Sequence, residues 1–369
     1  MKQYRCDFNN SLVNLSSSIL KYYGIEPFHT TLKPLDELLE KKQYDKITVI
    51  LFDGLNKYIK EQHLKSSDVL IKKVKFNITS VFPPTTAAAT TAFLSGKFPI
   101  ETGWLGWSQH FNNLNVTLDM FSNRISKTDE FYKTKASYEF CPYKTILDLI
   151  NESNNAKAYS VYPQKINNGE AKDLSNFFDI LNNKMKGNSK QFIYAYWTDP
   201  DSSIHAEGVH SHHVKDVIKY INKHVARLAK LNPDNLILVI ADHGLIDAQY
   251  EYITEHKDLY SLLKFDPYLD SRSLLVQVKE NKHQEFEDLF NRYYGERYLL
   301  LPKQKYLEKQ YFGIGKTFDK IDNFLGDYLI TALTEKTLVV PDPNGEELIG
   351  QHAGSMEEEF VISVAVFND

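Results

Sequence analysis

Three continuous apolar runs of strand length constrain the fold of this chain more than any other feature. They cover Lys46–Phe52, Gln191–Trp197 and Leu236–Ala241. Because apolar residues do not alternate with polar ones, each run is typical of a strand buried on both faces of a parallel sheet. Stretches with helical spacing separate the runs, at 55–65, 144–152, 171–185 and 214–230. This order predicts an α/β fold with a mostly parallel central sheet and helices on both faces.

A further strand–helix–strand pattern lies outside this alternation. It consists of Ser273–Val278, His283–Tyr294 and Arg297–Leu301. We interpret it as a small inserted α+β cap over residues 265–315, with residues 1–264 and 316–369 forming the core. At 42.7 kDa the chain is long enough for one large domain with such an insertion. Residues 108–142 have no clear period, which predicts irregular structure.

Charge and cysteine content bear on the partners and the location of the protein. A formal net charge of −5 and the lack of a basic stripe argue against a nucleic acid duplex as the main partner. Cys6 and Cys141 lie far apart, which fits a reducing compartment better than a disulfide scaffold. No apolar run approaches the length of a membrane span. We therefore expect a cytoplasmic protein that does not bind membranes, and the oligomeric state stays open.

Carboxylates and imidazoles follow each of the apolar runs. Asp53-Gly54 ends the first, Asp201 and His205 follow the second, and Asp242-His243-Gly244 ends the third. Open α/β sheets bind their ligands at the carboxyl ends of such strands. A spacing of four puts Asp201 and His205 on one face of a helical turn, where both can bind one metal ion. Each pattern also has a purely structural interpretation, because Asp-Gly is a common turn and an Asp–His pair can cap a helix.

Another loop carries hydroxyl groups at a strand-to-helix turn. A β-rich run, Phe76–Val81, meets Pro83 and Pro84, and an alanine- and threonine-rich segment that favours a helix follows. The first N–H groups of a helix have no intrahelical acceptor, so a phosphoryl group would be stabilised beside them. The alternative interpretation is that Thr85 or Thr86 is only an N-cap.

Together with a late histidine, the strand ends supply three carboxylates and three imidazoles. They are Asp53, Asp201, His205, Asp242, His243 and His352. This is the number and kind of ligands for two zinc-type ions with positions left open for substrate, although manganese and iron accept the same ligands. One ion would lower the pKa of a threonine hydroxyl, and the other would hold a phosphoryl oxygen. The pattern therefore predicts metal-dependent phosphoryl chemistry.

These motifs resemble the alkaline phosphatase superfamily, and within it the nucleotide pyrophosphatase/phosphodiesterase-like branch of type I phosphodiesterases. The resemblance rests on Asp53-Gly54, Phe82-Pro83-Pro84-Thr85-Thr86 with Ser95-Gly96, Asp201-x-x-x-His205, Asp242-His243-Gly244 and His352-Ala353-Gly354, in the family order. It implies a three-layer alkaline-phosphatase-like core with Thr86 as the nucleophile. It also implies that Asp201, His205 and His352 bind one metal ion, and that Asp53, Asp242 and His243 bind the other.

The activity implied by the resemblance is hydrolysis of phosphodiester or pyrophosphate bonds of a small phosphate ester, such as a nucleotide, through a phosphothreonine intermediate. The candidate substrate-binding residues are Thr85, Ala87, Trp104 and Trp107; the tryptophans either stack on a flat group or form a hydrophobic lid. Polar residues that the resemblance implies just after the nucleophile are absent, because Ala87 and Ala89 stand there. Two alternatives therefore stay open. One is a phosphomonoesterase, phosphonate hydrolase or phosphosugar mutase of the same superfamily, and the other is a non-catalytic metal-binding protein.

Overall fold

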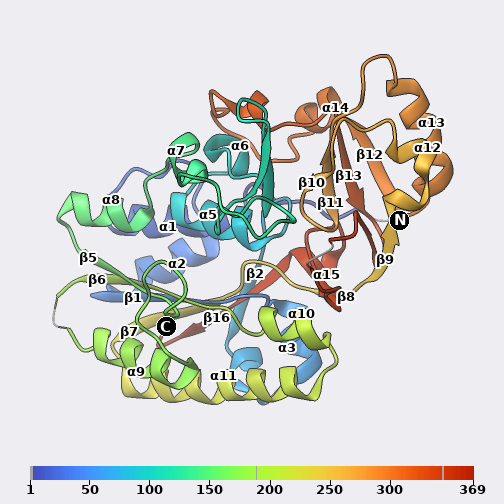
Figure 1. Ribbon diagram of the computed structural model, residues 1–369. Helices are drawn as coiled ribbons and strands as arrows, with labels where there is room; N and C mark the ends of the chain where they lie inside the picture. The colour runs from blue at the N-terminus through green and yellow to red at the C-terminus, as the bar shows by residue number, and fades with distance from the viewer. Residues whose placement is uncertain (1–2, 188, 343–344) are drawn as a thin grey trace.

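The computed structural model describes residues 3–187, 189–342 and 345–369. Its main sheet has six strands in the order β2-β16-β7-β1-β6-β5 (Figure 1). These strands are β1 (Lys46–Phe52), β2 (Val74–Thr79), β5 (Lys157–Val161), β6 (Gln191–Trp197), β7 (Asn235–Ile240) and β16 (Val361–Phe367). β7, β1, β6 and β5 are parallel, whereas β16 is antiparallel to both of its neighbours. The three apolar runs form adjacent strands of a mostly parallel sheet, as predicted.

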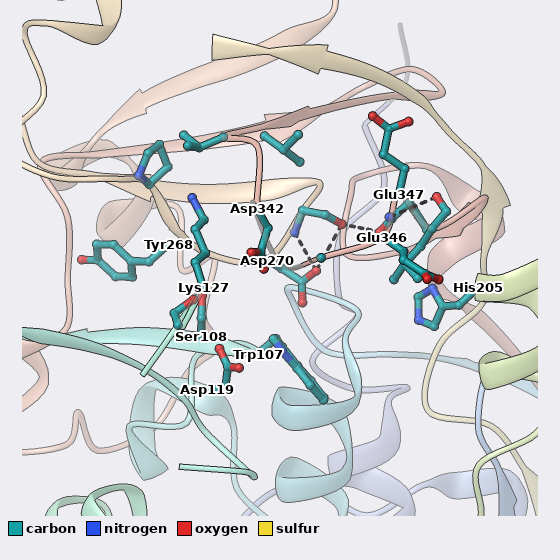
Figure 2. A pocket seen from close by; sticks show the side chains of 18 of the residues that line it. Trp107, Ser108, Asp119, Lys127, His205, Tyr268, Asp270, Asp342, Glu346 and Glu347 are labelled. Atoms are coloured by element: carbon teal, nitrogen blue, oxygen red, sulfur yellow. Dashed lines mark hydrogen bonds between the residues drawn. The ribbon is translucent and has the colours of Figure 1, made fainter. Parts of the chain in front are cut away.

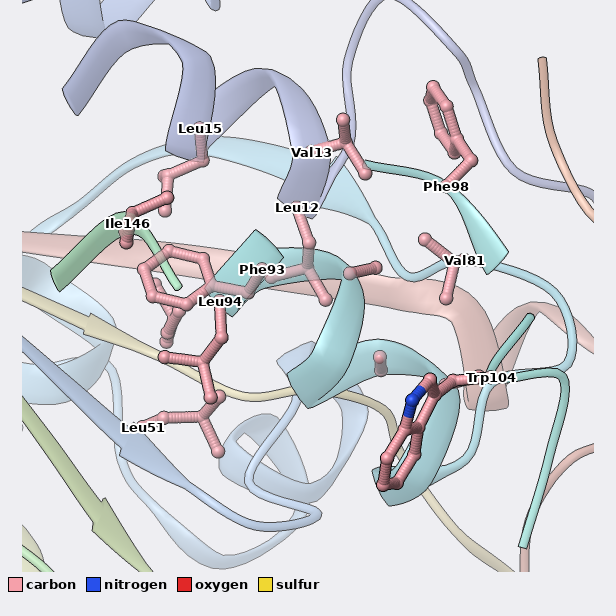
Figure 3. Close-up of a cluster of buried hydrophobic side chains, with 14 of the residues drawn as sticks. Leu12, Val13, Leu15, Leu51, Val81, Phe93, Leu94, Phe98, Trp104 and Ile146 are labelled. Carbon is pink, nitrogen blue, oxygen red and sulfur yellow. The ribbon is translucent and has the colours of Figure 1, made fainter. Parts of the chain in front are cut away.

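Helices cover both faces of this sheet (Figure 1). The helices of the described residues, including those that pack elsewhere, are α1 (Leu12–Tyr22), α2 (Lys33–Lys41), α3 (Lys57–His63), α4 (Val69–Lys72), α5 (Thr86–Ser95), α6 (Pro99–Thr102), α7 (Ala136–Phe140), α8 (Ile146–Ser153), α9 (Leu174–Lys184), α10 (Asp201–Glu207), α11 (His212–Leu231), α12 (Lys257–Tyr260), α13 (His283–Tyr294), α14 (Lys303–Glu308) and α15 (Glu357–Phe360), with 3-10 turns at Ile253–Glu255 and Ile321–Asn323. Val49 and Leu51 of β1 belong to one hydrophobic cluster with residues of α1, α5 and α8 (Figure 3). Ile50 and Phe52 belong to another, with residues of α3, α9 and α11. Because side chains alternate along a strand, β1 contributes to both layers, and the predicted α/β fold is confirmed.

A second sheet has the strand order β10-β11-β13-β12, and all of its pairs are antiparallel. Its strands are β10 (Tyr268–Leu269), β11 (Ser273–Val276), β12 (Tyr298–Pro302) and β13 (Tyr328–Ala332). Apolar residues of α13 pack on this sheet in a third hydrophobic cluster. The strand–helix–strand pattern predicted for the cap is thus present, although β13 lies beyond the predicted range of 265–315. The boundary between core and cap stays a prediction.

Residues 108–142 are more regular than predicted. They contain an antiparallel hairpin of β3 (Ser108–Phe111) and β4 (Val116–Asp119), followed by α7. Each strand has only four residues, too few for alternation to stand out in the sequence. The backbone N–H of Leu269 donates to Ser108 Oγ at 3.1 Å, which joins the hairpin to the second sheet. The other short strands are β8 (Ile246–Asp247), β9 (Gln249–Tyr252), β14 (Lys336–Val339) and β15 (Gly350–Gln351).

Two features bear on the predicted location. Within the described residues, no helix combines the length and the hydrophobicity that a membrane span requires. Cys6 and Cys141 are free thiols, and burial raises the pKa of both to about 12. The cytoplasmic location stays a prediction.

Lys60 of α3 is a fully buried lysine. Its Nζ donates to the backbone oxygen of Ser363 at 2.8 Å, and burial lowers its pKa to about 7. A lysine in an unfolded chain keeps its proton up to about pH 10.4. Between about pH 7 and pH 10 the unfolded chain therefore binds more protons, and the contribution of Lys60 to the free energy of unfolding rises with pH by up to about 1.4 kcal/mol per unit.

We expect Lys60→Met to remove this rise, because methionine fills the site without a titrating group. Urea unfolding of wild type and variant at about pH 7 and about pH 9 measures the difference in slope. Lys57→Met is the control, since Lys57 lies half-buried on the same helix. If the free energy of unfolding rises with pH equally in Lys60→Met and in the wild type, the Lys60 amine is not neutral in the folded protein.

Candidate active site

The predicted site residues lie at the carboxyl end of the main sheet. Asp53 follows β1, Asp242 and His243 follow β7, and Asp201 begins α10 just after β6. His352 follows β15. Because β6, β1 and β7 are adjacent and parallel, their carboxyl ends share one edge. Strand order therefore brings together residues that are far apart in the sequence.

Thr86 is the first residue of α5, and only 8% of it is exposed. Its Oγ1 lies 3.1 Å from His243 Nε2 and 3.3 Å from Asp53 Oδ2. Thr85 takes the N-cap position with extended backbone, and its side chain is fully buried. The backbone N–H groups of Thr86 and Ala87 are thus among the first in the helix, where no intrahelical acceptor exists. A hydroxyl and anion-binding N–H groups therefore meet at one point.

Two overlapping groups of ligand atoms surround this hydroxyl. The ligand atoms of Asp53, Asp242 and His243 all lie within 4.8 Å of one another, and so do those of Asp201, His243 and His352. His205 adjoins the second group, with its Nε2 3.3 Å from Asp201 Oδ2. The structure thus brings all six predicted ligands into one site. His243 lies between the two groups, with Nε2 3.3 Å from Asp53 Oδ1 and 3.6 Å from Asp242 Oδ2.

The electrostatics of these groups fit divalent cations. Asp201 Oδ1 and Asp242 Oδ2 are buried and accept no hydrogen bond from the described residues. Burial, with the charges of Asp242 and Asp201, raises the pKa of Asp53 well above its usual value. Buried carboxylates without partners are costly, and cations between them would remove that cost.

The orientation of His205 also fits a ligand role. Its Nδ1 lies 2.7 Å from the backbone oxygen of Gly350, which can only accept. The proton of the neutral ring is therefore at Nδ1, and Nε2 is left to face Asp201 and an ion. Burial opposes charge on this ring, but the Asp201 carboxylate outweighs it and raises the pKa of His205 to about 9.

Sequence reasoning missed Tyr196, the partner of Asp53 on β6. Its hydroxyl donates a hydrogen bond to Asp53 Oδ2. Tyr196 pairs with Leu51 in the register of β1 and β6, which places it beside the end of β1. A tyrosine inside an apolar run is typical of the core, so only the strand register reveals this contact.

Two cavities open on Thr86. The first has a volume of about 610 Å³ and includes His205, His352, Trp107 and Asp270 in its lining (Figure 2). The second, of about 380 Å³, is aromatic, and its lining includes Trp107, Phe121, Tyr138, Tyr143 and Tyr162. Both are also lined by Asp201. A substrate bound at Thr86 thus has room for a group on each side.

Only one of the four candidate substrate-binding residues, Trp107, lines these cavities. Trp104 lies fully buried in the core, where its Nε1 donates to the backbone oxygen of Cys141 at 2.9 Å (Figure 3). The side chains of Thr85 and Ala87 are also fully buried. The ring available for stacking is therefore that of Trp107, and Ala87 can contribute through its backbone N–H.

The family follows from comparison with known proteins. A model of the type I phosphodiesterase/nucleotide pyrophosphatase family matches residues 47–311. The chain belongs to this family. A search of curated proteins finds no match.

Solved structures of ectonucleotide pyrophosphatase/phosphodiesterase 5 share the family fold. The murine protein is 17% identical, with a TM-score of 0.65 over 87% of this chain and 88% of the murine chain. An inactive form of the murine protein in complex with AMP is 16% identical, with a TM-score of 0.64 over 87% of each chain. The human protein is 15% identical, with a TM-score of 0.65 over 87% of each chain.

A buried ion pair supports the loops that carry the imidazoles. The side chains of Arg272 and Glu359 are completely buried, and Arg272 Nε lies 2.7 Å from Glu359 Oε1. The backbone N–H of Gly354, two residues after His352, donates to Glu359 Oε1 at 2.6 Å. The backbone N–H of Gly244, next to His243, donates to the backbone oxygen of Glu359 at 3.0 Å. Glu359 thus joins the His243 and His352 loops, and Arg272 neutralises it from the second sheet.

We expect Arg272→Met to lower the free energy of unfolding by about 3–5 kcal/mol, because Glu359 would be left buried without a counter-charge. The control is Arg297→Met, since Arg297 forms a half-exposed pair with Glu251 at 3.0 Å and should lose about 1 kcal/mol or less. Urea unfolding measures both variants. If both variants lose about the same small free energy of unfolding, the buried Arg272–Glu359 pair stabilises the protein no more than the half-exposed pair does.

Proposed function

We propose that the protein is a two-metal hydrolase that cleaves phosphodiester or pyrophosphate bonds, with Thr86 as the nucleophile. The observation that carries this proposal is the position of Thr86 Oγ1. It lies 3.1 Å from His243 and 3.3 Å from Asp53, at the start of a helix, and faces two cavities. Membership of the type I phosphodiesterase/nucleotide pyrophosphatase family supports the reaction class.

In this proposal Asp53, Asp242 and His243 hold one divalent cation, and Asp201, His205 and His352 hold the other. When bound, such cations supply Lewis acidity and neutralise charge on the phosphoryl group. Zinc suits this mixture of imidazole and carboxylate, and manganese or iron is compatible with it.

The residues of the chain have distinct roles in the first displacement. Thr86 Oγ1 forms a bond to phosphorus, and the bond from phosphorus to the leaving oxygen breaks on the opposite side. Thr86 Oγ1 donates a hydrogen bond to Asp53 Oδ2 at 3.3 Å, which orients the hydroxyl. The pKa of this hydroxyl would be lowered by a cation held by Asp53, Asp242 and His243, so that its proton leaves to solvent. The N–H groups of Thr86 and Ala87 bind a non-bridging oxygen as charge develops on it. Water then cleaves the phosphothreonine and restores the hydroxyl.

The second cavity favours a flat retained group, such as a nucleobase. Trp107, Tyr143 and Tyr162 line it, and aromatic rings stack on bases without regard to sequence. The AMP complex of the inactive murine relative is compatible with a nucleotide at this site.

Three p-nitrophenyl esters test the proposal in the presence of zinc or manganese. Thymidine 5′-monophosphate p-nitrophenyl ester presents a diester with a base, bis-p-nitrophenyl phosphate presents a diester without one, and p-nitrophenyl phosphate is a monoester. We expect the highest kcat/KM for the thymidine ester. Faster cleavage of the monoester would instead indicate a phosphomonoesterase, and no turnover of any ester would favour a metal-binding protein without this activity.

A further inference from the structure

The first cavity differs from the second in charge. Its lining includes the carboxylates of Asp270 and Glu347, and neither forms an ion pair with a lysine or arginine among the described residues (Figure 2). Its basic side chains are Arg124 and Lys127. Both are already paired, Arg124 with Asp119 at 2.9 Å and Lys127 with Asp266 at 2.8 Å. The remaining charge in this part of the cavity is therefore negative.

Asp270 is held in place in this cavity. Its Oδ1 accepts a hydrogen bond from the backbone N–H of Ser271 at 2.7 Å. Ser271 is itself fixed, because its Oγ donates to Gln351 Oε1 at 2.6 Å, one residue before His352. Burial raises the pKa of Asp270 to about 6, which still leaves the carboxylate ionised at pH 8. A fixed negative charge thus lies next to the loop that carries a proposed metal ligand.

Aromatic rings complete the same cavity. Tyr250 and Tyr252 line it, with their ring centroids 6.2 Å apart and an angle of 30° between the ring planes. The hydroxyl of Tyr252 donates to Glu347, and that of Tyr250 donates to the backbone oxygen of Leu348 at 3.1 Å. Carboxylates beside aromatic rings attract cations and repel anions.

The cavity also lies on the side of the leaving group. It contains His205 and His352, whereas the second cavity contains Asp53 and the aromatic cluster. In-line displacement sends the leaving oxygen away from Thr86, and we assign it to the side of His205 and His352, which line the first cavity. This assignment rests on the proposed function.

We propose that the first cavity selects substrates whose leaving group carries a positive charge, such as an amino alcohol, with Asp270 as the specificity-determining residue. An anionic leaving group such as pyrophosphate meets unpaired carboxylates in the same place. The substrate class is therefore a diester with an aromatic retained group and a cationic alcohol.

The test uses the 2-aminoethyl and 2-hydroxyethyl diesters of thymidine 5′-monophosphate with the metal-loaded enzyme. Cleavage with the proposed orientation yields thymidine 5′-monophosphate, whereas the reverse orientation yields thymidine, so the product reports which group leaves. The readout is the ratio of kcat/KM for the aminoethyl ester to that for the hydroxyethyl ester. Intrinsic differences between the two alcohols cancel when this ratio is compared between variants.

We expect Asp270→Asn to lower the ratio by about fivefold or more, because it removes one fixed negative charge near the ammonium group. Asp258→Asn, which removes an exposed carboxylate bonded to Tyr293, should leave the ratio unchanged. If Asp270→Asn does not fold, Glu347→Gln takes its place as the variant expected to lower the ratio. In the wild-type enzyme the ratio must also fall as salt is added, because salt screens the attraction between the carboxylates and the ammonium group.

The outcomes separate this inference from the proposed function. The enzyme could cleave the thymidine p-nitrophenyl ester while the aminoethyl-to-hydroxyethyl ratio of kcat/KM responds neither to salt nor to Asp270→Asn. That result would overturn the preference for a cationic leaving group and leave the proposed function intact. Thymidine as the product of the aminoethyl ester would overturn the orientation. Failure to cleave any thymidine ester would overturn the proposed function, and the inference with it.

Discussion

Replacing Thr86 by alanine is expected to lower kcat/KM for thymidine 5′-monophosphate p-nitrophenyl ester by about 10³-fold or more. The reason is that the Oγ1 removed is the hydroxyl that lies 3.1 Å from His243 and 3.3 Å from Asp53. Without it, no group at this position can form the covalent intermediate, and the remaining residues can only bind and polarise the substrate. The initial rate of p-nitrophenolate release measures the loss.

Thr85→Ala is the matched control for this variant. It removes a hydroxyl from the preceding residue, which is fully buried and lines neither cavity. We expect Thr85→Ala to keep most of the activity. If Thr85→Ala loses activity while Thr86→Ala keeps it in full, the nucleophile is Thr85 and not Thr86. Rapid quenching should also trap a thymidine 5′-phosphoryl group bonded to Thr86 in the wild-type enzyme and none in Thr86→Ala.

Replacing Asp201 by asparagine is expected to weaken zinc binding by about 100-fold or more, and to reduce turnover at limiting zinc in parallel. Asp201 Oδ1 is buried and accepts no hydrogen bond from the described residues, while Oδ2 lies 3.3 Å from His205 Nε2. An amide at this position keeps the shape but loses the charge that would balance a divalent cation. Isothermal titration of the metal-free protein with zinc measures the affinity.

Asp199→Asn is the control for Asp201, two residues earlier in the same turn. Asp199 Oδ1 accepts from Ser203 Oγ at 2.6 Å, and Oδ2 accepts from Trp197 Nε1 at 3.3 Å, so both oxygens are already used. Zinc affinity should be unchanged in Asp199→Asn. Chelation should abolish wild-type turnover, and added zinc should restore it. Equal affinity in all three proteins, or turnover that survives complete chelation, would contradict the metal site.

The sequence alone determined the α/β core and which carboxylates lie together in the candidate site. Lys46–Phe52 and its two companion runs are almost entirely apolar, which is typical of strands buried on both faces, and such strands pair at the centre of a parallel sheet. Their carboxyl ends then share an edge, which is why Asp53, Asp201 and Asp242 could be grouped without a structure. Local patterns are sufficient for these three carboxylates because each lies within a few residues of the end of a strong strand signal.

Only the tertiary structure decided the contacts that support and shape this site. Arg272 and Glu359 are 87 residues apart, and nothing in the residues around either one indicates the other. The sequence likewise does not indicate that Asp270 lines the first cavity. Nor does it indicate that Trp104 lies in the core whereas Trp107 lines the cavities. Side-chain direction and long-range pairing depend on how the second sheet and the β3–β4 hairpin pack against the core. Sequence periodicity reports burial along one element, and it carries no information about which distant element completes the contact.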